Sequence, residues 1–311
     1  MLLSAIVGRG LACCAAMAAL LALACIAGPS AAQTGSGRAV FSAGVVGGDI
    51  DGDGMGDLVL AGPDGLEVRP GSGGPYAAVP VRGARAAAVG DIDDDGRAEV
   101  VTLSGQTVRL WRLRGGVWYD EIVLELRDGE GLHVACGDVD GDGPAEVAVA
   151  LGLSRPGAEV RPSRVLLLNR VQGAWGIAAR VEFSRHIGAL CLMDVDGDGR
   201  AELTVEQGGE EVGGYIETYA FEEDTARLLH GAQLSEGGRV LQMSAVDGVL
   251  GALTGGRVGL WGWNGGAWVR QPGVSAPAAR GLLLWRPLGD SGIEIVGQGP
   301  AGVWRLDGLG F

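Results

Sequence analysis

The stretch GDIDGDGMGDLVLAG, Gly48–Gly62, places four aspartates within nine positions and continues directly into an apolar segment. So many like charges in one loop repel one another unless a cation lies among them. The apolar residues behind the loop have the composition and length of a buried strand. The stretch therefore predicts a cation-binding loop that leads into a β-strand.

The same pattern occurs three more times along the chain. The copies are GDIDDDGRAEVVTLSG from Gly90, GDVDGDGPAEVAVALG from Gly137 and MDVDGDGRAELTVEQGG from Met193, and the first aspartates are 42, 47 and 56 residues apart. A glycine turn with aromatic neighbours follows several copies, as in RLWRLRGGVW, LLLNRVQGAW and GLWGWNGGAW. Periods of this length are typical of repeat architectures, and each has room for about four short strands.

Each complete loop, here called loop 1 to loop 4 in chain order, has acids at positions 1, 3, 5 and 9 and glycine at position 6. Alternating carboxylates on a tightly curled backbone converge on one point, and the glycine permits a sharp turn. The backbone carbonyl at position 7 would complete the cage, so that side chain is free to vary. An Ile or Val at position 2 is expected to anchor the loop in the core. The candidate metal ligands are Asp49, Asp51, Asp53, Met55 and Asp57 in loop 1; Asp91, Asp93, Asp95, Arg97 and Glu99 in loop 2; Asp138, Asp140, Asp142, Pro144 and Glu146 in loop 3; and Asp194, Asp196, Asp198, Arg200 and Glu202 in loop 4.

The all-oxygen ligand set favours Ca²⁺, which takes six to eight oxygens at about 2.3–2.6 Å. Mg²⁺ resists dehydration and is rarely held by protein ligands alone, and Zn²⁺ prefers the His and Cys residues that these loops lack. An EF-hand is excluded because it needs a glutamate at position 12 and flanking helices. Position 12 is Leu60, Thr102, Val149 or Val205, and the residues around it are typical of strands. We expect about four Ca²⁺ ions with a structural role.

The repeats predict an all-β fold, a six-bladed β-propeller with calcium-binding loops. Two degenerate units complete the six, one near Gly248–Gly256 and one in GDSGIEIVGQGPAGVWRLDG, where Asp290 and Glu294 keep two acidic positions. Seven blades are the alternative if the 56-residue interval hides a lost unit. The last unit is short of one strand, which RAVFSAGVVGGD before loop 1 could supply. The ring would then be closed by N- and C-terminal strands that share a blade, which leaves no sheet edge at the closure.

The loops and their strands resemble the FG-GAP/VCBS repeats of integrin-α-like β-propellers, which carry the pattern D-x-D-x-D-G-x-x-[DE]-[LIV]. The resemblance covers the chain from about residue 38 to the end, closely in four units and faintly in two. It implies a propeller that holds Ca²⁺ in hairpin loops of individual blades, with the ligands at the positions given above. The FG and GAP signatures are missing from several units.

The N-terminus is predicted to be an export signal. Arg9 precedes an apolar run, Leu11–Gly28, and Ser30 and Ala32 fit a cleavage site after Ala32. The predicted division is a signal peptide at 1–32, a linker at 33–37 and the propeller at 38–311, in a protein that is secreted, periplasmic or on the cell surface. An uncleaved anchor and lipid modification at Cys25 are the alternatives. After cleavage Cys136 and Cys191 remain, and we favour two buried thiols over a disulfide.

The net charge and the motifs restrict the classes of function that fit this chain. A net charge of −14 disfavours nucleic acid and anionic lipid as partners. We expect a secreted binding or adhesion module for a protein or glycan, without membrane insertion after cleavage. We expect no enzymatic activity and no catalytic residues, because the clustered acids are committed to the loops and His133, His186 and His230 adjoin no nucleophile motif. A propeller-based polysaccharide lyase or hydrolase, or an anchored part of an envelope assembly, is the alternative. The recurring tryptophans fit packing between blades better than sugar stacking.

Overall fold

The computed structural model describes residues 45–62, 65–73, 77–81, 83–153, 161–209, 212–222, 225–233, 239–276, 279, 281–285, 293–299 and 302–309. All of them belong to one compact unit, Gly37–Phe311. The predicted signal peptide and linker lie outside the described residues. Among those residues no helix is long and apolar enough to cross a lipid bilayer.

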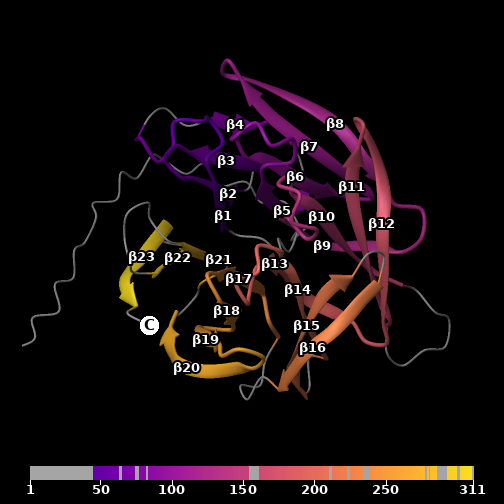
Figure 1. Cartoon of the computed structure of the whole chain (residues 1–311). Helices are drawn as coiled ribbons and strands as arrows, with labels where there is room; N and C mark the ends of the chain where they lie inside the picture. Colours follow the sequence, from indigo (N-terminus) through magenta and orange to yellow (C-terminus); the bar gives the residue numbers. More distant parts are fainter. Residues whose placement is uncertain are drawn as a thin grey trace, which may run out of the picture. The chain divides into compact units, whose positions relative to one another are not determined.

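The described residues form a β-propeller of antiparallel sheets arranged around a central axis (Figure 1). Each sheet is built from consecutive strands, and blades 1 to 6 are numbered in chain order. Blade 1 contains β1 (Val45–Gly48), β2 (Asp57–Gly62), β3 (Gly65–Arg69) and β4 (Ala77–Val79). Blade 2 contains β5 (Ala84–Gly90), β6 (Glu99–Ser104), β7 (Thr107–Arg114) and β8 (Val117–Glu125). Blade 3 contains β9 (Glu130–Gly137), β10 (Glu146–Gly152), β11 (Ser163–Val171) and β12 (Ala174–Phe183).

The second half of the unit repeats this order with one strand fewer. Blade 4 contains β13 (Ile187–Met193), β14 (Glu202–Gly209), β15 (Val212–Glu222) and β16 (Thr225–Gln233). Blade 5 contains β17 (Gln242–Val246), β18 (Val249–Thr254), β19 (Arg257–Trp263) and β20 (Trp268–Ser275). Blade 6 contains β21 (Gly281–Trp285), β22 (Ile293–Gly299) and β23 (Gly302–Leu309).

The blade count corrects the expectation from the sequence. The described residues form five complete four-stranded blades, not six or seven, and the sixth unit is a three-stranded sheet. The interval between loops 3 and 4 is long mainly because ten residues separate β10 from β11, and a single blade fills it.

The segment predicted to close the ring belongs only in part to the described residues, because residues 38–44 lie outside them. Val45–Gly48 pairs with β2 as the first strand of blade 1, with Gly48 opposite Asp57, so it is not a fourth strand for blade 6. Among the described residues, side chains join the first and last blades. Leu58 and Leu60 of β2 pack in one cluster with Leu283 of β21 and Val296 of β22. In the part of the chain that the structure describes, blades 1 and 6 are therefore joined by apolar packing.

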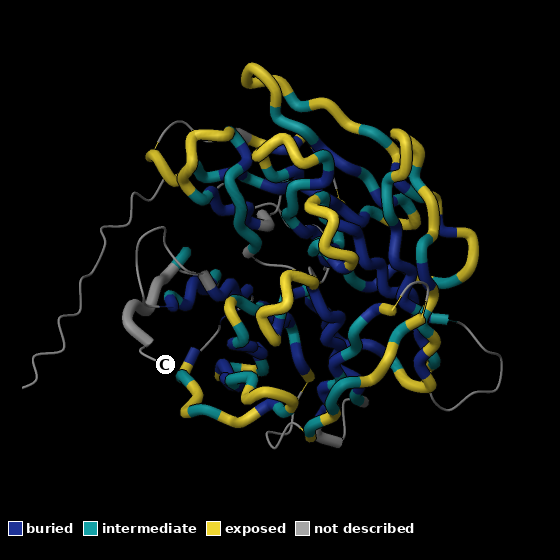
Figure 2. The backbone as a smooth tube through the Cα atoms, in the orientation of Figure 1, coloured by how far each residue is buried: buried dark blue, intermediate teal, exposed yellow. Residues whose placement is uncertain are grey.

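Burial follows the position of a strand in its blade (Figure 2). Every residue of β10 is buried, because sheets pack on both of its faces, whereas the outermost strands β8, β12 and β16 are partly exposed. The position-2 residues are buried as predicted, and these are Ile50, Ile92, Val139 and Val195.

The hairpin tryptophans pack between neighbouring blades, which confirms the packing interpretation for three of them. Trp118 and Trp175 lie against apolar clusters that span two blades, and Trp268 is buried in another. The indole N–H of Trp175 donates to Glu121 of blade 2 at 2.5 Å, and that of Trp268 to Thr218 of blade 4 at 2.8 Å. Cys136 and Cys191 are free thiols on β9 and β13.

Candidate metal centres

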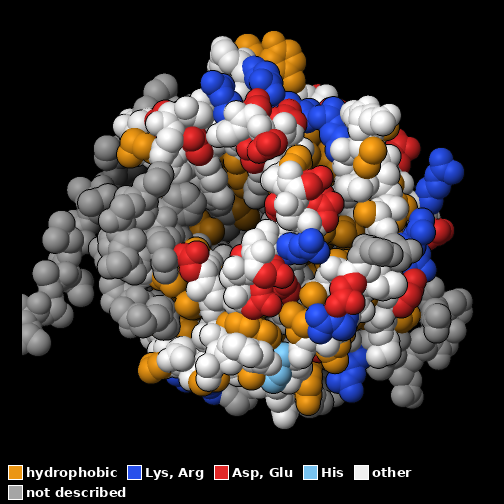
Figure 3. All heavy atoms as spheres, in the orientation of Figure 1, with side chains coloured by type: hydrophobic (Ala, Val, Ile, Leu, Met, Phe, Trp, Pro, Cys, Tyr) orange, Lys and Arg blue, Asp and Glu red, His pale blue; other side chains and the backbone are white. Residues whose placement is uncertain are grey.

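Loops 1 to 4 connect the innermost strand of a blade to the second strand, so they lie at the same end of blades 1 to 4. The residue before position 1 pairs with position 9 across each hairpin, as in Gly90 opposite Glu99 and Gly137 opposite Glu146. This register closes every loop over eight residues. Figure 3 shows acidic side chains in separate groups around a hollowed centre.

The first aspartate organises each loop. Its Oδ2 accepts the position-6 amide in all four loops, at 2.8–3.0 Å. Its Oδ1 accepts the position-4 amide in loops 1, 3 and 4, for example from Gly141 to Asp138 at 2.7 Å. The backbone therefore curls around the first carboxylate and carries the later acids toward it.

Left-handed backbone occurs at two positions of each loop. The position-6 glycines have φ of 81°, 81°, 107° and 87°, as the sequence indicated. Position 4 is left-handed as well, in Gly52, Gly141, Gly197 and also Asp94, whose φ is 54°. This requirement was not predicted, although the glycine at position 4 in three of the four loops was its signal.

The position-9 acid is the buried member of each set. Asp57, Glu99, Glu146 and Glu202 are 1–5% exposed. One oxygen of each accepts the position-2 amide at 2.8–2.9 Å, which ties the loop to the core. Burial raises the pKa of each of the three glutamates to about 7. A nearby cation would favour their charged forms.

The carboxylates converge as a metal site requires. In each loop three acidic residues offer oxygens that lie within 4.8 Å of one another. Positions 1, 3 and 9 form these sets in loops 2, 3 and 4, whereas positions 1, 3 and 5 form the set in loop 1. In loop 2, Oδ1 of Asp93 is buried without a hydrogen-bond partner among the described residues. An all-oxygen donor set with an unsatisfied buried oxygen fits a hard cation.

Loop 1 differs from the prediction at position 9. Oδ2 of Asp57 accepts the amides of Ile50 and Asp51, and Oδ1 accepts the amide of Gly71 at 2.8 Å. Both oxygens are thus engaged by the backbone, and Asp53 takes the third place in the set. In loops 2 to 4 the position-5 acids, Asp95, Asp142 and Asp198, lie outside the sets. The position-7 carbonyls remain predicted ligands.

Positively charged side chains of β7 contact loop 2. Arg112 and Arg114 extend from β7, and Arg112 Nε lies 3.2 Å from Asp93 Oδ2. Arg114 Nη2 lies 2.8 Å from Asp95 Oδ2 and 3.4 Å from Asp93 Oδ2. Guanidinium groups therefore offset part of the acidic charge that a metal would otherwise offset. These contacts between arginines and loop 2 were not predicted from the sequence.

Neighbouring loops are bonded to one another. The position-8 amides of Ala98, Ala145 and Ala201 donate to the position-1 carbonyls of Asp49, Asp91 and Asp138 in the preceding loop, at 2.5–2.7 Å. Small residues allow this approach. A Cβ on Gly48, Gly90 or Gly137 would come within 2.5–2.8 Å of side-chain carbons on the next blade. Loops 1 to 4 are therefore one connected row.

The repeat unit itself is similar to a known family. Residues 91–149 match the FG-GAP-like repeat. The matched segment runs from the first aspartate of loop 2 through loop 3 into β10. The matched segment thus contains loops 2 and 3 and the bond between Ala145 and Asp91. No curated protein matches the chain significantly. The propeller fold with an FG-GAP-like repeat is consistent with a binding module in general.

Proposed function

We propose that loops 1 to 4 bind Ca²⁺ and that the ions stabilise the propeller. The observation that carries this proposal is the convergence of three carboxylates in the corresponding loop of four successive blades. Without a cation, each loop holds at least four acids together in a chain of net charge −14. A bound divalent ion removes that repulsion and joins the two strands that flank the loop.

The expected energies suit a structural role. Calcium modules outside cells often bind at about 10⁻⁴–10⁻³ M. For a tighter site, with free calcium at about 100 times the dissociation constant, each ion adds about 2.7 kcal/mol to the free energy of unfolding. A few such sites are comparable to the whole net stability of a domain, about 5–15 kcal/mol. The loops supply oxygen ligands and hold them in place, and the ion supplies the charge.

We further propose that the calcium-stabilised propeller is an exported binding or adhesion module for a protein or a glycan. The predicted signal at residues 1–32 supports export. A compartment with millimolar calcium would keep weak sites filled. The fold alone does not identify a ligand. The proposed ligand class, a protein or a glycan, is inferred from the resemblance to FG-GAP repeats.

The test is thermal unfolding of the protein from Gln33 onward, with about 1 mM Ca²⁺ and with chelator, together with metal analysis. We expect a large calcium-dependent rise in the unfolding midpoint and several bound ions per chain. Mg²⁺ at the same concentration is the control and should give a much smaller rise. An unchanged midpoint and no bound calcium would refute the metal proposal.

A further inference from the structure

Among the described residues, loop 2 is the one acidic loop whose metal set forms ion pairs with arginine. Arg112 Nε lies 3.2 Å from Asp93 Oδ2 and 3.7 Å from Glu99 Oε1. Both acids belong to the three-residue set of the loop. Oε1 is the oxygen that Glu99 has left after Oε2 accepts the amide of Ile92. Arg112 therefore lies beside oxygens that a bound cation would use.

The place of Arg112 in its blade explains why loop 2 differs from the other loops. Position 10 of each loop pairs with the third strand of its blade, in the pairs Leu58 with Arg69, Val100 with Trp111, Val147 with Leu168 and Leu203 with Tyr219. The residues that follow these partners on the third strands are Pro70, Arg112, Asn169 and Ala220. The one charged residue of the four lies in blade 2.

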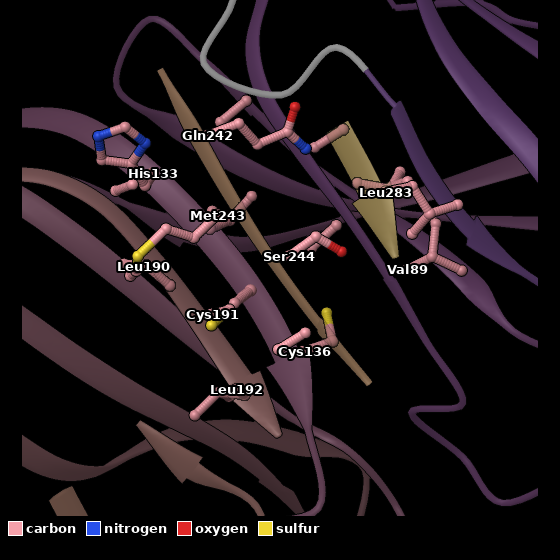
Figure 4. A pocket seen from close by; sticks show the side chains of 18 of the residues that line it. Val89, His133, Cys136, Leu190, Cys191, Leu192, Gln242, Met243, Ser244 and Leu283 are labelled. Atoms are coloured by element: carbon pink, nitrogen blue, oxygen red, sulfur yellow. The ribbon is translucent and has the colours of Figure 1, made fainter. Parts of the chain in front are cut away.

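The inner side of loop 2 is bordered by a neutral group. Gly90, which precedes the loop, lies against β9, where an added Cβ would come within 2.6 Å of the Cβ of Cys136. Cys136 lines the central cavity between the innermost strands (Figure 4). Burial raises the pKa of this thiol, and the charge of Glu99 raises it further. Cys136 is therefore uncharged, and the positive charge beside Glu99 comes from β7 on the other side.

Arg112 has a second carboxylate partner outside the loop. Its Nη1 lies 2.9 Å from Oε2 of Glu121 on β8. Oε1 of the same carboxylate accepts the indole N–H of Trp175 at 2.5 Å, and Arg170 Nη2 lies 3.4 Å from Oε2. Trp175 and Arg170 belong to the outer hairpin of blade 3. One guanidinium thus connects loop 2 to the carboxylate that holds this hairpin.

Arg112 is enclosed between these two groups of acids. Its side chain is 13% exposed, so the guanidinium has carboxylates rather than water as its partners. In the described part of the chain, Arg112 Nη2 and Asp93 Oδ1 are buried atoms without a hydrogen-bond partner. Asp93 thus has an oxygen free for a cation, and Arg112 has an N–H free for a further bond. A small rotation of the guanidinium would exchange one group of acids for the other.

We propose that Arg112 has two positions and couples the calcium state of loop 2 to the contact between blades 2 and 3, an inference that rests on the calcium proposal above. In the metal-free loop, Arg112 bonds Asp93 and Glu99. In the loaded loop, Arg112 is repelled by the second positive charge, leaves these two acids and bonds Glu121 alone. Because Glu121 also accepts the indole N–H of Trp175, that bond changes with the occupancy of loop 2.

The indole N–H resonance of Trp175 tests the proposal, followed by NMR while Ca²⁺ is added to the metal-free protein. We expect it to shift as one calcium site fills, and to shift more than the indole resonance of Trp111. Trp111 is the internal control, because its N–H donates to Thr102 at 2.9 Å within blade 2. Bound calcium with an unmoved Trp175 would overturn the coupling. Absence of bound calcium would instead refute the metal proposal itself.

A matched pair of variants assigns the response to a loop. Asp93→Asn and Asp140→Asn change position 3 of loops 2 and 3, and each should lose the calcium of its own loop. The shift of Trp175 should disappear in Asp93→Asn and persist in Asp140→Asn. This comparison is needed because Trp175 lies in the same blade as loop 3. A shift lost only in Asp140→Asn would assign the signal to loop 3 and overturn the proposal.

Further variants separate the two positions of Arg112, with the calcium affinity of loop 2 measured by calorimetry. Arg112→Gln removes the competing charge and should raise this affinity about fivefold, whereas Glu121→Gln weakens the second position and should lower it by a similar factor. Arg109→Gln is the matched control, because Arg109 lies on the same strand and pairs with Asp120. It should leave the affinity unchanged. A lower affinity in folded Arg112→Gln would mean that Arg112 holds Asp93 in place for the metal, and would overturn the two-position proposal.

Discussion

The backbone amide of Ala145 donates a hydrogen bond of 2.7 Å to the carbonyl oxygen of Asp91. Asp91 is the first residue of loop 2, and Ala145 is the eighth position of loop 3. A residue that opens one candidate metal site is thus bonded to the neighbouring site. Ordering of one loop by a metal should therefore help to order the next.

The glycine before each linked loop should be intolerant of a side chain. In Gly90→Ala the new Cβ would lie 2.6 Å from the Cβ of Cys136 and 3.3 Å from that of Ala145. We expect a loss of about 1–3 kcal/mol in the free energy of unfolding, measured by chemical denaturation. Gly176→Ala on β12 is the control, because its Cβ would meet only Asn169 at 3.5 Å. Equal stability of the two variants would mean that the blades separate easily at this joint.

Glu146 should destabilise the metal-free protein at high pH, and it should stabilise the calcium-bound protein there. Burial raises the pKa of Glu146 from 4.5 to about 7. The folded state then holds the proton more tightly than the unfolded state. The contribution to stability is complete below pH 4.5 and is lost as the pH rises through 7.

Glu146→Gln removes the charge and keeps an oxygen that can accept the amide of Val139. In chelator we expect the variant and the wild type to be similar near pH 4.5. At about pH 8 the variant should be more stable by about 2 kcal/mol. Saturating calcium should reverse the order at about pH 8, because the ion binds the charged glutamate. Thermal unfolding at both pH values measures this. A variant that is less stable in chelator at the higher pH would contradict the assignment.

Loop 2 should bind calcium more weakly than loop 3. Arg114 lies 2.8 Å from Asp95 and 3.4 Å from Asp93, and a divalent ion must compete with that charge. We expect Arg114→Ala to raise the calcium affinity of one site by about tenfold, which corresponds to about 1.4 kcal/mol. Calorimetric titration measures the change. Arg109→Ala, on the same strand but paired with Asp120, should leave every site unchanged.

Asp94 should be a strained position. It has φ of 54°, where the other loops have glycine. Asp94→Gly should stabilise the metal-free protein by about 0.5–1 kcal/mol, because glycine adopts this conformation without steric cost. Asp94→Asn keeps the strain and removes the charge, which also acts on Asp142 in loop 3. Equal gains from the two variants in chemical denaturation would assign the effect to charge rather than to backbone conformation.

The acidic loops could be predicted because their chemistry is local. Ligands, turn residues and the buried position-2 side chain all lie within nine positions, so one register reveals them together. The contacts of Arg112 and Arg114 with loop 2 could not be predicted. They depend on how β7, about 20 residues further along the chain, packs beside loop 2. Asp57 illustrates a finer limit. Its side chain is shorter than glutamate by one methylene, and only the fold brings the amide of Gly71 to it.

The partner of the strand before loop 1 was difficult to predict for a similar reason. The apolar pattern before loop 1 indicated a strand, and β1 is a strand. Its partner was decided by the hairpin, because Gly48 lies opposite Asp57 across the loop. Composition does not distinguish a strand that begins its own blade from one that completes another. The side chains that join blades 1 and 6, such as Leu60 and Val296, come from opposite ends of the chain.

The row of loops has two distinct ends. Loop 1 has Gly56 where the later loops have alanine, and loop 4 follows Met193 where the earlier loops follow glycine. Each inner unit contacts the unit before it through one set of groups and the unit after it through another set, as in a head-to-tail assembly. A tandem copy of blade 3 could therefore join the row without any new complementary surface. The units at the two ends would still terminate the row of bonded loops.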